Sequence, residues 1–188
     1  MRQNRPFRGH TQLDYPQLLE MHRVVDGVLA PNCLRKKQRF NISVAIIDVA
    51  VGAFCFQASR QIWVAVMFGV LAALFLAAGI FYFRIAALTA KRQMDKRTFS
   101  TDYTFDDEEM RGVNARGEAH YPYENCSRLV ETEGNLYFVT ARGEVVMLAK
   151  GGLQGGTAEE LREFLQEKCG RTVETVGPDW KVRPAAGQ

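Results

Sequence analysis

The sequence predicts an α+β protein in which a two-helix transmembrane hairpin precedes an antiparallel β-sheet that is closed by a C-terminal helix. Residues 40–83 carry only two charges, Asp48 and Arg60, whereas the flanking sequence is polar and charged. About six short segments rich in Thr, Tyr, Phe and Val follow, and the last amphipathic segment begins at Thr157. A soluble domain distributes its apolar residues over many short segments, so this partition indicates a lipid-facing part and an aqueous part.

The first predicted unit, residues 1–38, is an N-terminal cytoplasmic segment with one amphipathic helix. Asp14 is suited to cap its start, Pro16 falls in the first turn, and Pro31 lies beyond its end. One wide face is apolar, with Leu18, Leu19, Met21, Val25, Val28 and Leu29. We expect this face to pack on the C-terminal domain or on the membrane surface, and binding of a partner protein is the alternative.

Residues 39–96 form the predicted transmembrane hairpin, with spans at about 40–59 and 61–83 and a short helical extension. Each span matches the roughly 20 residues that a helix needs to cross a hydrocarbon core of about 30 Å. The second span has no charge and no proline. The first contains Asp48, which costs roughly 2.5–3.5 kcal/mol at mid-helix. A single span preceded by a re-entrant segment is therefore the alternative.

Basic residues predict the orientation of the hairpin. Four precede the first span (Arg35, Lys36, Lys37, Arg39) and five follow the second (Arg84, Lys91, Arg92, Lys96, Arg97), whereas the turn at 58–61 has only Arg60. The positive-inside rule places both termini in the cytoplasm. The first 39 residues lack the apolar run of a signal peptide, so we expect a multi-pass membrane protein whose two spans are both retained.

Small residues and Asp48 mark the predicted helix contacts within the membrane. Asp48 shares a face of the first span with Ala45 and Gly52, and the second span repeats a small residue every four positions at Ala65, Gly69, Ala73 and Ala77. We predict that these two faces pack together and shield Asp48 from lipid. No cation lies opposite in the hairpin, so Asp48 is protonated, hydrogen-bonded or paired with another subunit.

Residues 97–171 form the predicted soluble domain, and residues 172–188 a flexible tail. The strand candidates are separated by turn signals such as Arg116-Gly117 and Arg142-Gly143, which favours an antiparallel meander. Thr157 and Glu160 form a capping box for the closing helix, and Gly170 ends it. A sheet closed by one C-terminal helix is the plan of a pleckstrin-homology-like (PH-like) domain.

Five segments of the predicted soluble domain form a recognisable series: YTFDDEEM, AHYPYENCSRLVET, NLYFVT, VVMLAKGGL and AEELREFLQEK. In these motifs the chain resembles the bacterial YcxB-like family of two-span membrane proteins with a C-terminal PH-like domain. Tyr121 and Tyr123 stand where the family pattern suggests a tryptophan, and Lys150 is followed by two glycines instead of a bulky or basic residue. The resemblance implies the fold and an inner-membrane location, and it carries over no catalytic residue.

The sequence predicts no catalytic site, no cofactor and no metal. Cys33, Cys55, Cys126 and Cys169 are widely spaced and are read as reduced thiols, with a zinc site as the disfavoured alternative. The KGGLQGG segment lacks the spacing of a P-loop, and the acidic run at 106–109 lacks that of an EF-hand. Residues 1–97 carry a net charge of +9 and residues 98–188 of −6, which argues against nucleic acid as a ligand of the C-terminal domain.

These features predict a non-enzymatic inner-membrane protein whose hairpin anchors a cytoplasmic interaction or regulatory domain. The expected partners are the lipid bilayer, further copies of the chain through the transmembrane helices, and a cytoplasmic protein segment or small ligand. The alternative is a small oligomeric transporter or channel that uses Asp48 within the membrane.

Overall fold

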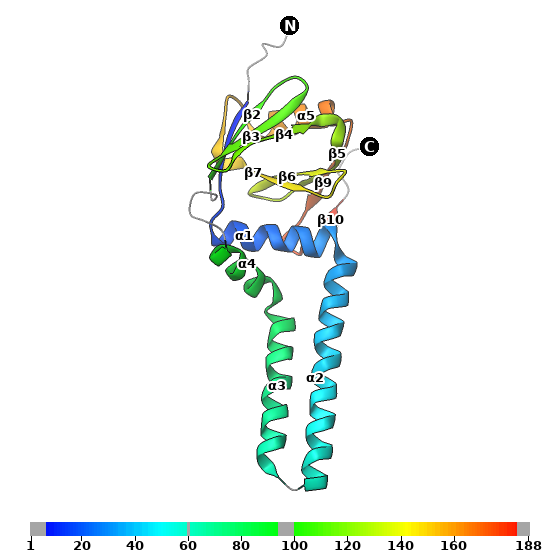
Figure 1. Cartoon of the computed structure of the whole chain (residues 1–188). Coiled ribbons are helices and arrows are strands. Elements are labelled where there is room, and N and C mark those ends of the chain that lie inside the picture. The colour runs from blue at the N-terminus through cyan, green and yellow to red at the C-terminus, as the bar shows by residue number, and fades with distance from the viewer. Residues whose placement is uncertain (1–6, 60, 94–99, 184–188) are drawn as a thin grey trace. The chain divides into compact units, whose positions relative to one another are not determined.

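The computed structural model describes residues 7–59, 61–93 and 100–183 of the chain (Figure 1). Two compact units make up the chain: a hairpin unit, His22–Ala90, and a sandwich unit, Met1–Met21 with Lys91–Gln188. Arg60 of the predicted turn, and Lys96 and Arg97 at the predicted domain boundary, lie outside the described residues.

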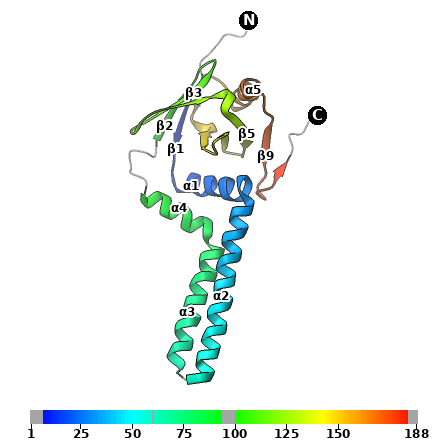
Figure 2. The ribbon, with the colours of Figure 1, turned by 45° about the vertical axis from the view of Figure 1, so that its right-hand side comes forward.

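Two long helices dominate the hairpin unit. A π-helix, η1 (Arg23–Leu29), leads into α2 (Pro31–Ser59), and α3 (Ile62–Ile80) runs back beside it (Figures 1 and 2). The helix predicted for 40–59 therefore begins nine residues earlier. Phe81 leaves helical geometry, with φ −93° and ψ 17°, two residues after the weak helix former Gly79. The predicted helical extension is thus a separate helix, α4 (Tyr82–Gln93).

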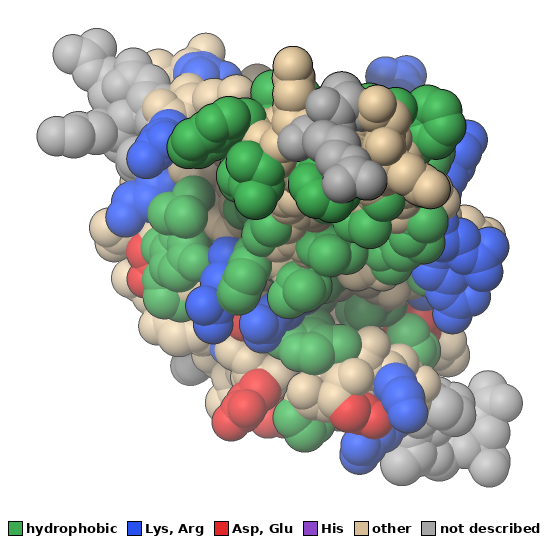
Figure 3. Space-filling model, turned by 90° about the horizontal axis from the view of Figure 1, so that it is seen from below, with side chains coloured by type: hydrophobic (Ala, Val, Ile, Leu, Met, Phe, Trp, Pro, Cys, Tyr) green, Lys and Arg blue, Asp and Glu red, His purple; other side chains and the backbone are tan. Residues whose placement is uncertain are grey.

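The surfaces of α2 and α3 are mainly apolar and uncovered within the chain. Both helices are long and apolar enough to cross a membrane. Phe54 on α2 is 72% exposed, and Trp63 on α3 is 81% exposed. In the view from the end of the hairpin, hydrophobic side chains gather over the middle of the picture, with Lys and Arg side chains on both sides of them (Figure 3). Exposed apolar surface on this scale is unusual for a soluble monomer.

The N-terminal segment is more ordered than predicted. Residues Arg8–Gln12 form strand β1, which the sequence does not indicate because RGHTQ is short and polar. The predicted helix starts as expected, since the carboxylate of Asp14 accepts a hydrogen bond from the backbone N–H of Gln17 at 3.0 Å. It is α1 only over Tyr15–His22 and continues as η1. Residues 7–21 thus belong to the sandwich unit and do not form a separate segment.

All six predicted strands are present, but they form two sheets instead of one meander. The strands are β2 (Ser100–Phe105), β3 (Glu109–Asn114), β4 (Gly117–Pro122), β5 (Cys126–Glu131), β6 (Asn135–Thr140) and β7 (Val145–Ala149). The first sheet has the order β4-β3-β2-β1-β8, where β8 is Leu153–Gln154. The second has the order β10-β9-β5-β6-β7, where β9 is Val173–Val176 and β10 is Val182–Arg183. The short 3-10 helix η3 (Tyr123–Asn125) separates the two runs of strands.

Two of the strands lie in the segment predicted to be a flexible tail. Strand β9 (Val173–Val176) pairs with β5 in parallel, and β10 (Val182–Arg183) pairs with β9. Val173 is buried, and Glu174 accepts two hydrogen bonds from the guanidinium of Arg128, at 3.0 and 2.6 Å. The tail prediction is therefore wrong for these strands, because a long-range pairing orders a stretch with little local signal. The parallel pair also makes the sheet mixed.

The closing helix confirms the capping prediction. In α5 (Ala158–Cys169) the Thr157 side chain accepts from the N–H of Glu160, and the Glu160 carboxylate accepts from the N–H of Thr157. Gly170 ends the helix in the left-handed conformation, with φ 60°. Leu161 and Leu165 of α5 are buried in one core with residues of both sheets: Tyr103, Phe105, Met110, Leu129, Leu136, Phe138, Val146, Leu148 and Val173.

Candidate functional site

Asp48 lies on the face of α2 that meets α3. Ala45 and Gly52, one turn to either side, are buried, and a Cβ atom on Gly52 would lie 2.8 Å from Cβ of Phe68. The Oδ2 atom of Asp48 is buried and accepts no hydrogen bond from the residues that the structure describes. Asp48 as a whole is half-buried, so this one carboxyl oxygen is enclosed at the helix contact without a partner among the described residues.

The small residues of α3 do not all lie at this contact. Ala65 and Ala77 are half-buried, whereas Gly69 and Ala73 are exposed, and a Cβ on Gly69 would meet nothing within 4 Å. Phe68 and Ala72 occupy the contact line instead, and Ala72 is only 3% exposed. A spacing of four residues drifts around a helix, whereas a seam between paired helices alternates spacings of three and four. The sequence predicted that Gly69 and Ala73 lie at the contact with α2, whereas the structure leaves both residues exposed.

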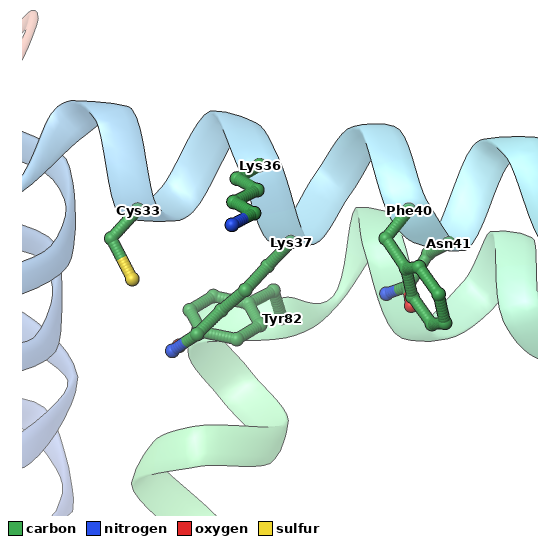
Figure 4. A pocket seen from close by; sticks show the side chains of 6 residues that line it. All are labelled: Cys33, Lys36, Lys37, Phe40, Asn41 and Tyr82. Atoms are coloured by element: carbon green, nitrogen blue, oxygen red, sulfur yellow. The ribbon is translucent and has the colours of Figure 1, made fainter.

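A pocket of about 400 Å³ opens at the end of the hairpin unit where α2 begins and α3 ends. Its lining residues are Cys33, Lys36, Lys37, Phe40, Asn41 and Tyr82. In Figure 4, Cys33, Lys36 and Lys37 extend from α2 toward Tyr82, and Phe40 and Asn41 follow one turn further along. The lining is mainly carbon, from the two rings and the lysine stems. Basic heads on an apolar wall make this pocket amphipathic.

A chain of polar contacts fixes one side of this pocket. The Lys37 ammonium donates to the Tyr82 hydroxyl at 2.8 Å, and that hydroxyl donates to Oδ2 of Asp26 at 3.3 Å. Lys37 Nζ also lies 5.1 Å from the centroid of the Tyr82 ring. Nδ1 of His22 is 3.5 Å from the same Asp26 oxygen. Lys36, by contrast, makes no hydrogen bond or ion pair with the described part of the chain. In the sequence, Lys36 and Lys37 served only to predict the orientation of the hairpin in the membrane, and Tyr82 was not predicted to be a site residue.

Glu20 of α1 holds a cluster of polar groups on the second sheet. Its Oε1 accepts hydrogen bonds from Thr132 Oγ1 at 2.5 Å, Asn135 Nδ2 at 2.8 Å and Tyr137 OH at 3.1 Å. Burial, and then the negative charge of Glu20, raise the pKa of Tyr137. A carboxylate surrounded by neutral donors is suited to hold α1 against the sheet. These four residues do not include a nucleophile paired with a base, so the cluster does not indicate catalysis.

Two of the four cysteines come together in the sandwich unit. Cys126 is buried at the start of β5, and its thiol shares a hydrogen bond with the half-buried thiol of Cys169 at the end of α5. This hydrogen bond lowers the pKa of Cys126 and raises that of Cys169. None of the four cysteines forms a disulfide within the described chain. They look scattered in the sequence because the two members of this pair are distant along the chain.

The other charged motifs have partners within the fold. In the acidic run, Asp106 and Glu109 lie 3.3 and 2.9 Å from the guanidinium of Arg111, and Asp107 binds Lys168 at 3.0 Å. The glycine-rich segment packs on β1, since a Cβ on Gly152 would collide with the carbonyl oxygen of His10. Within the described ranges, no group of three or more His, Cys, Asp or Glu could hold a metal ion.

Comparisons with known proteins identify one part of this chain. Residues 105–165 match the family described as YcxB-like protein. The matched segment runs from the end of β2 to Leu165 of α5, so it covers most of the two sheets and their closing helix. A search of curated proteins found no match.

Proposed function

We propose, from the match of residues 105–165 to the YcxB-like family, that the protein is a non-enzymatic inner-membrane protein with a cytoplasmic interaction domain. The observation that carries the proposal is the contrast between the two units. The hairpin unit exposes its large apolar side chains along both long helices, whereas the sandwich unit buries its own in a continuous core. Lipid is a suitable solvent for this exposed apolar surface of α2 and α3, which supports insertion of the hairpin into a membrane.

The architecture of the sandwich unit supports a PH-like domain. Three consecutive strands, β2–β4, contribute to one sheet, the next three, β5–β7, to the other, and α5 follows. Strand β1, before the hairpin, and strands β9 and β10, after α5, extend this plan. The proposed role of this domain is to bind a cytoplasmic protein segment or a small ligand on its sheets. The basic residues that flank the hairpin favour the orientation with both termini in the cytoplasm.

The test of the interaction role is proximity labelling from a biotin ligase fused to the C-terminus. We expect a reproducible set of cytoplasmic neighbours that is lost when the sandwich unit is deleted from the fusion and the hairpin is kept. Labelling that is identical with and without the sandwich unit would contradict the proposal, because any membrane-anchored ligase would then give the same neighbours.

Self-association through α3 is part of the proposal. Gly69 and Ala73 are exposed on the outer side of α3, where a second helix can approach closely. We expect Gly69→Leu to lower the mass of the complex in mild detergent, measured by light scattering. The matched control is Val70→Leu at a neighbouring exposed position. An unchanged mass with Gly69→Leu, or an equal loss with Val70→Leu, would contradict association through this surface.

The enclosed Oδ2 of Asp48, which has no hydrogen-bond partner among the described residues, favours a second candidate function, a small oligomeric transporter or channel. This candidate predicts that the native chain carries a proton or cation flux into liposomes and that Asp48→Asn abolishes it while insertion is unchanged. Absence of flux with the native chain would eliminate the candidate and leave Asp48 as a helix-packing residue.

A further inference from the structure

The pocket at the basic end of the hairpin unit combines lysine side chains with aromatic rings, a combination that packing between helices does not require. Lys36, Phe40 and Tyr82 surround an opening of about 400 Å³, which falls within the range of roughly 300–1,000 Å³ that is typical of small-molecule sites. Phe40 remains 63% exposed although it lies beside this opening. The lining thus offers an uncovered aromatic surface next to ammonium groups.

The charges around the pocket are positive in balance. Lys36 has no hydrogen-bonding or ionic partner in the described chain, and Lys37 is held by the Tyr82 hydroxyl, with Asp26 behind it. Among the described residues, Asp26 is the acidic group that contacts this cluster, through the Tyr82 hydroxyl, and its charge offsets that of one of the two lysines. Arg35 and Arg39 lie on the same turns of α2 and are exposed outside the pocket lining. An anion with several oxygens complements this arrangement.

We propose that this pocket binds one anionic phospholipid, with its phosphate at the ammonium groups of Lys36 and Lys37 and its glycerol and first acyl carbons against Phe40 and Tyr82. The inference rests on the proposed insertion of the hairpin into the membrane. Basic pockets between transmembrane helices at the cytoplasmic side bind anionic headgroups. A soluble phosphate would use the ammonium groups but would leave the exposed ring of Phe40 uncovered, so the lipid is the better complement.

The test is a titration of the delipidated full chain in mild detergent, followed by native mass spectrometry. Phosphatidylglycerol is the probe, and phosphatidylcholine is the lipid control. We expect one molecule of phosphatidylglycerol per chain to be retained in preference to phosphatidylcholine. The double variant Lys36→Gln/Lys37→Gln should bind phosphatidylglycerol more weakly, by roughly fivefold for each lysine removed.

The matched control is Arg35→Gln/Arg39→Gln, which removes the same charge from the same turns of α2 outside the pocket. It should leave the affinity for phosphatidylglycerol close to that of the native chain. Equal losses in both double variants would show diffuse attraction to a basic helix end and would overturn the proposed site. Equal retention of the two lipids by the native chain would also overturn it.

Three further measurements distinguish the remaining explanations. Lys36→Gln alone removes a side chain that has no partner in the described chain, so it tests the site with the Lys37–Tyr82 contact intact. Displacement of phosphatidylglycerol by inorganic phosphate at equal concentration would assign the site to a soluble anion and contradict the lipid. Carbonate extraction of cell membranes reports insertion separately: loss of the native chain from the membrane fraction refutes the proposed function, whatever the detergent titration shows.

Discussion

At the scale of single residues, the Glu20 carboxylate is the group that most directly ties α1 to the second sheet. Three hydrogen-bond donors converge on its Oε1, from Thr132, Asn135 and Tyr137. Asn135 is 3% exposed and Tyr137 is fully buried, so water does not readily replace the carboxylate. A buried donor that loses its acceptor lowers the free energy of unfolding, so removal of the Glu20 carboxylate should destabilise the fold.

We therefore predict that Glu20→Ala destabilises the sandwich unit by about 1–3 kcal/mol, the usual penalty for unsatisfied buried polar groups. The measurement is amide hydrogen exchange of β6 in the full chain, where protection should fall. Glu133→Ala is the control, because Glu133 is exposed in the turn between β5 and β6. Unchanged protection with Glu20→Ala would refute the assigned role, as would an equal loss with the control.

Sequence reasoning reached some of these residues and not others, for a physical reason. Asp14, Thr157, Glu160 and Gly170 act within one helix turn, so a local pattern identifies them, and the structure confirms each. The partners of Glu20 lie more than 100 positions away along the chain. Tyr82 and Lys37 are likewise brought together only by the antiparallel course of α2 and α3. Contacts of this kind depend on topology, which residue spacing does not encode.

At the scale of elements, the contact between α2 and α3 depends on the absence of a side chain at Gly52. A methyl group there would lie 2.8 Å from Cβ of Phe68, which is attached to the helix backbone and does not move easily. We predict that Gly52→Ala weakens the hairpin by about 1–3 kcal/mol through overpacking. Thermal unfolding in mild detergent, followed by helical circular dichroism, measures this loss.

Gly69→Ala is the matched control for this prediction. Gly69 lies in the paired helix, and an added methyl group would meet nothing within 4 Å, so the substitution adds helix propensity and no clash. Measured at a detergent-to-protein ratio that keeps the chain monomeric, so that the proposed self-association does not contribute, its midpoint should equal or exceed that of the native chain. Equal destabilisation by the two substitutions would contradict the seam of Gly52 and Phe68 and would restore the predicted stripe of small residues as the contact.

The docking of β1 provides a second test at this scale. A Cβ on Gly152 would collide with the backbone of His10, whereas a Cβ on Gly151 would meet nothing within 4 Å. We predict that Gly152→Ala lowers the stability of the sandwich unit by about 1–3 kcal/mol, because a backbone contact cannot relax cheaply. Gly151→Ala should be nearly neutral. Hydrogen exchange of β1 distinguishes these outcomes, and equal protection in both variants would contradict the assigned packing.

Element positions were more predictable than element pairings. Alternating apolar residues and glycine turns located β2–β7, and the length of the apolar runs located α2 and α3. The division into two sheets, the insertion of β1 between β2 and β8, and the parallel pairing of β5 with β9 carry no local signal. They result from long-range contacts, such as the burial of Val173 against the shared core.

At the scale of the whole molecule, the proposed function requires α2 and α3 to cross a bilayer with both ends of the hairpin on the cytoplasmic side. Cys33 is exposed near the start of α2, and Gln57 is exposed near the turn between the helices. If the helices span the membrane, these two positions lie on opposite sides of it. A hairpin that rests on the surface would leave both positions on the same side.

The most direct test is labelling of Cys33, and of a Gln57→Cys variant, with a membrane-impermeant maleimide, with the labelled peptide identified by mass. We predict that Cys33 reacts in inverted inner-membrane vesicles and not from outside intact spheroplasts, and that residue 57 shows the reverse. Labelling of both positions from the same side would contradict the transmembrane hairpin, and the opposite pattern at both positions would contradict the cytoplasmic placement of the termini.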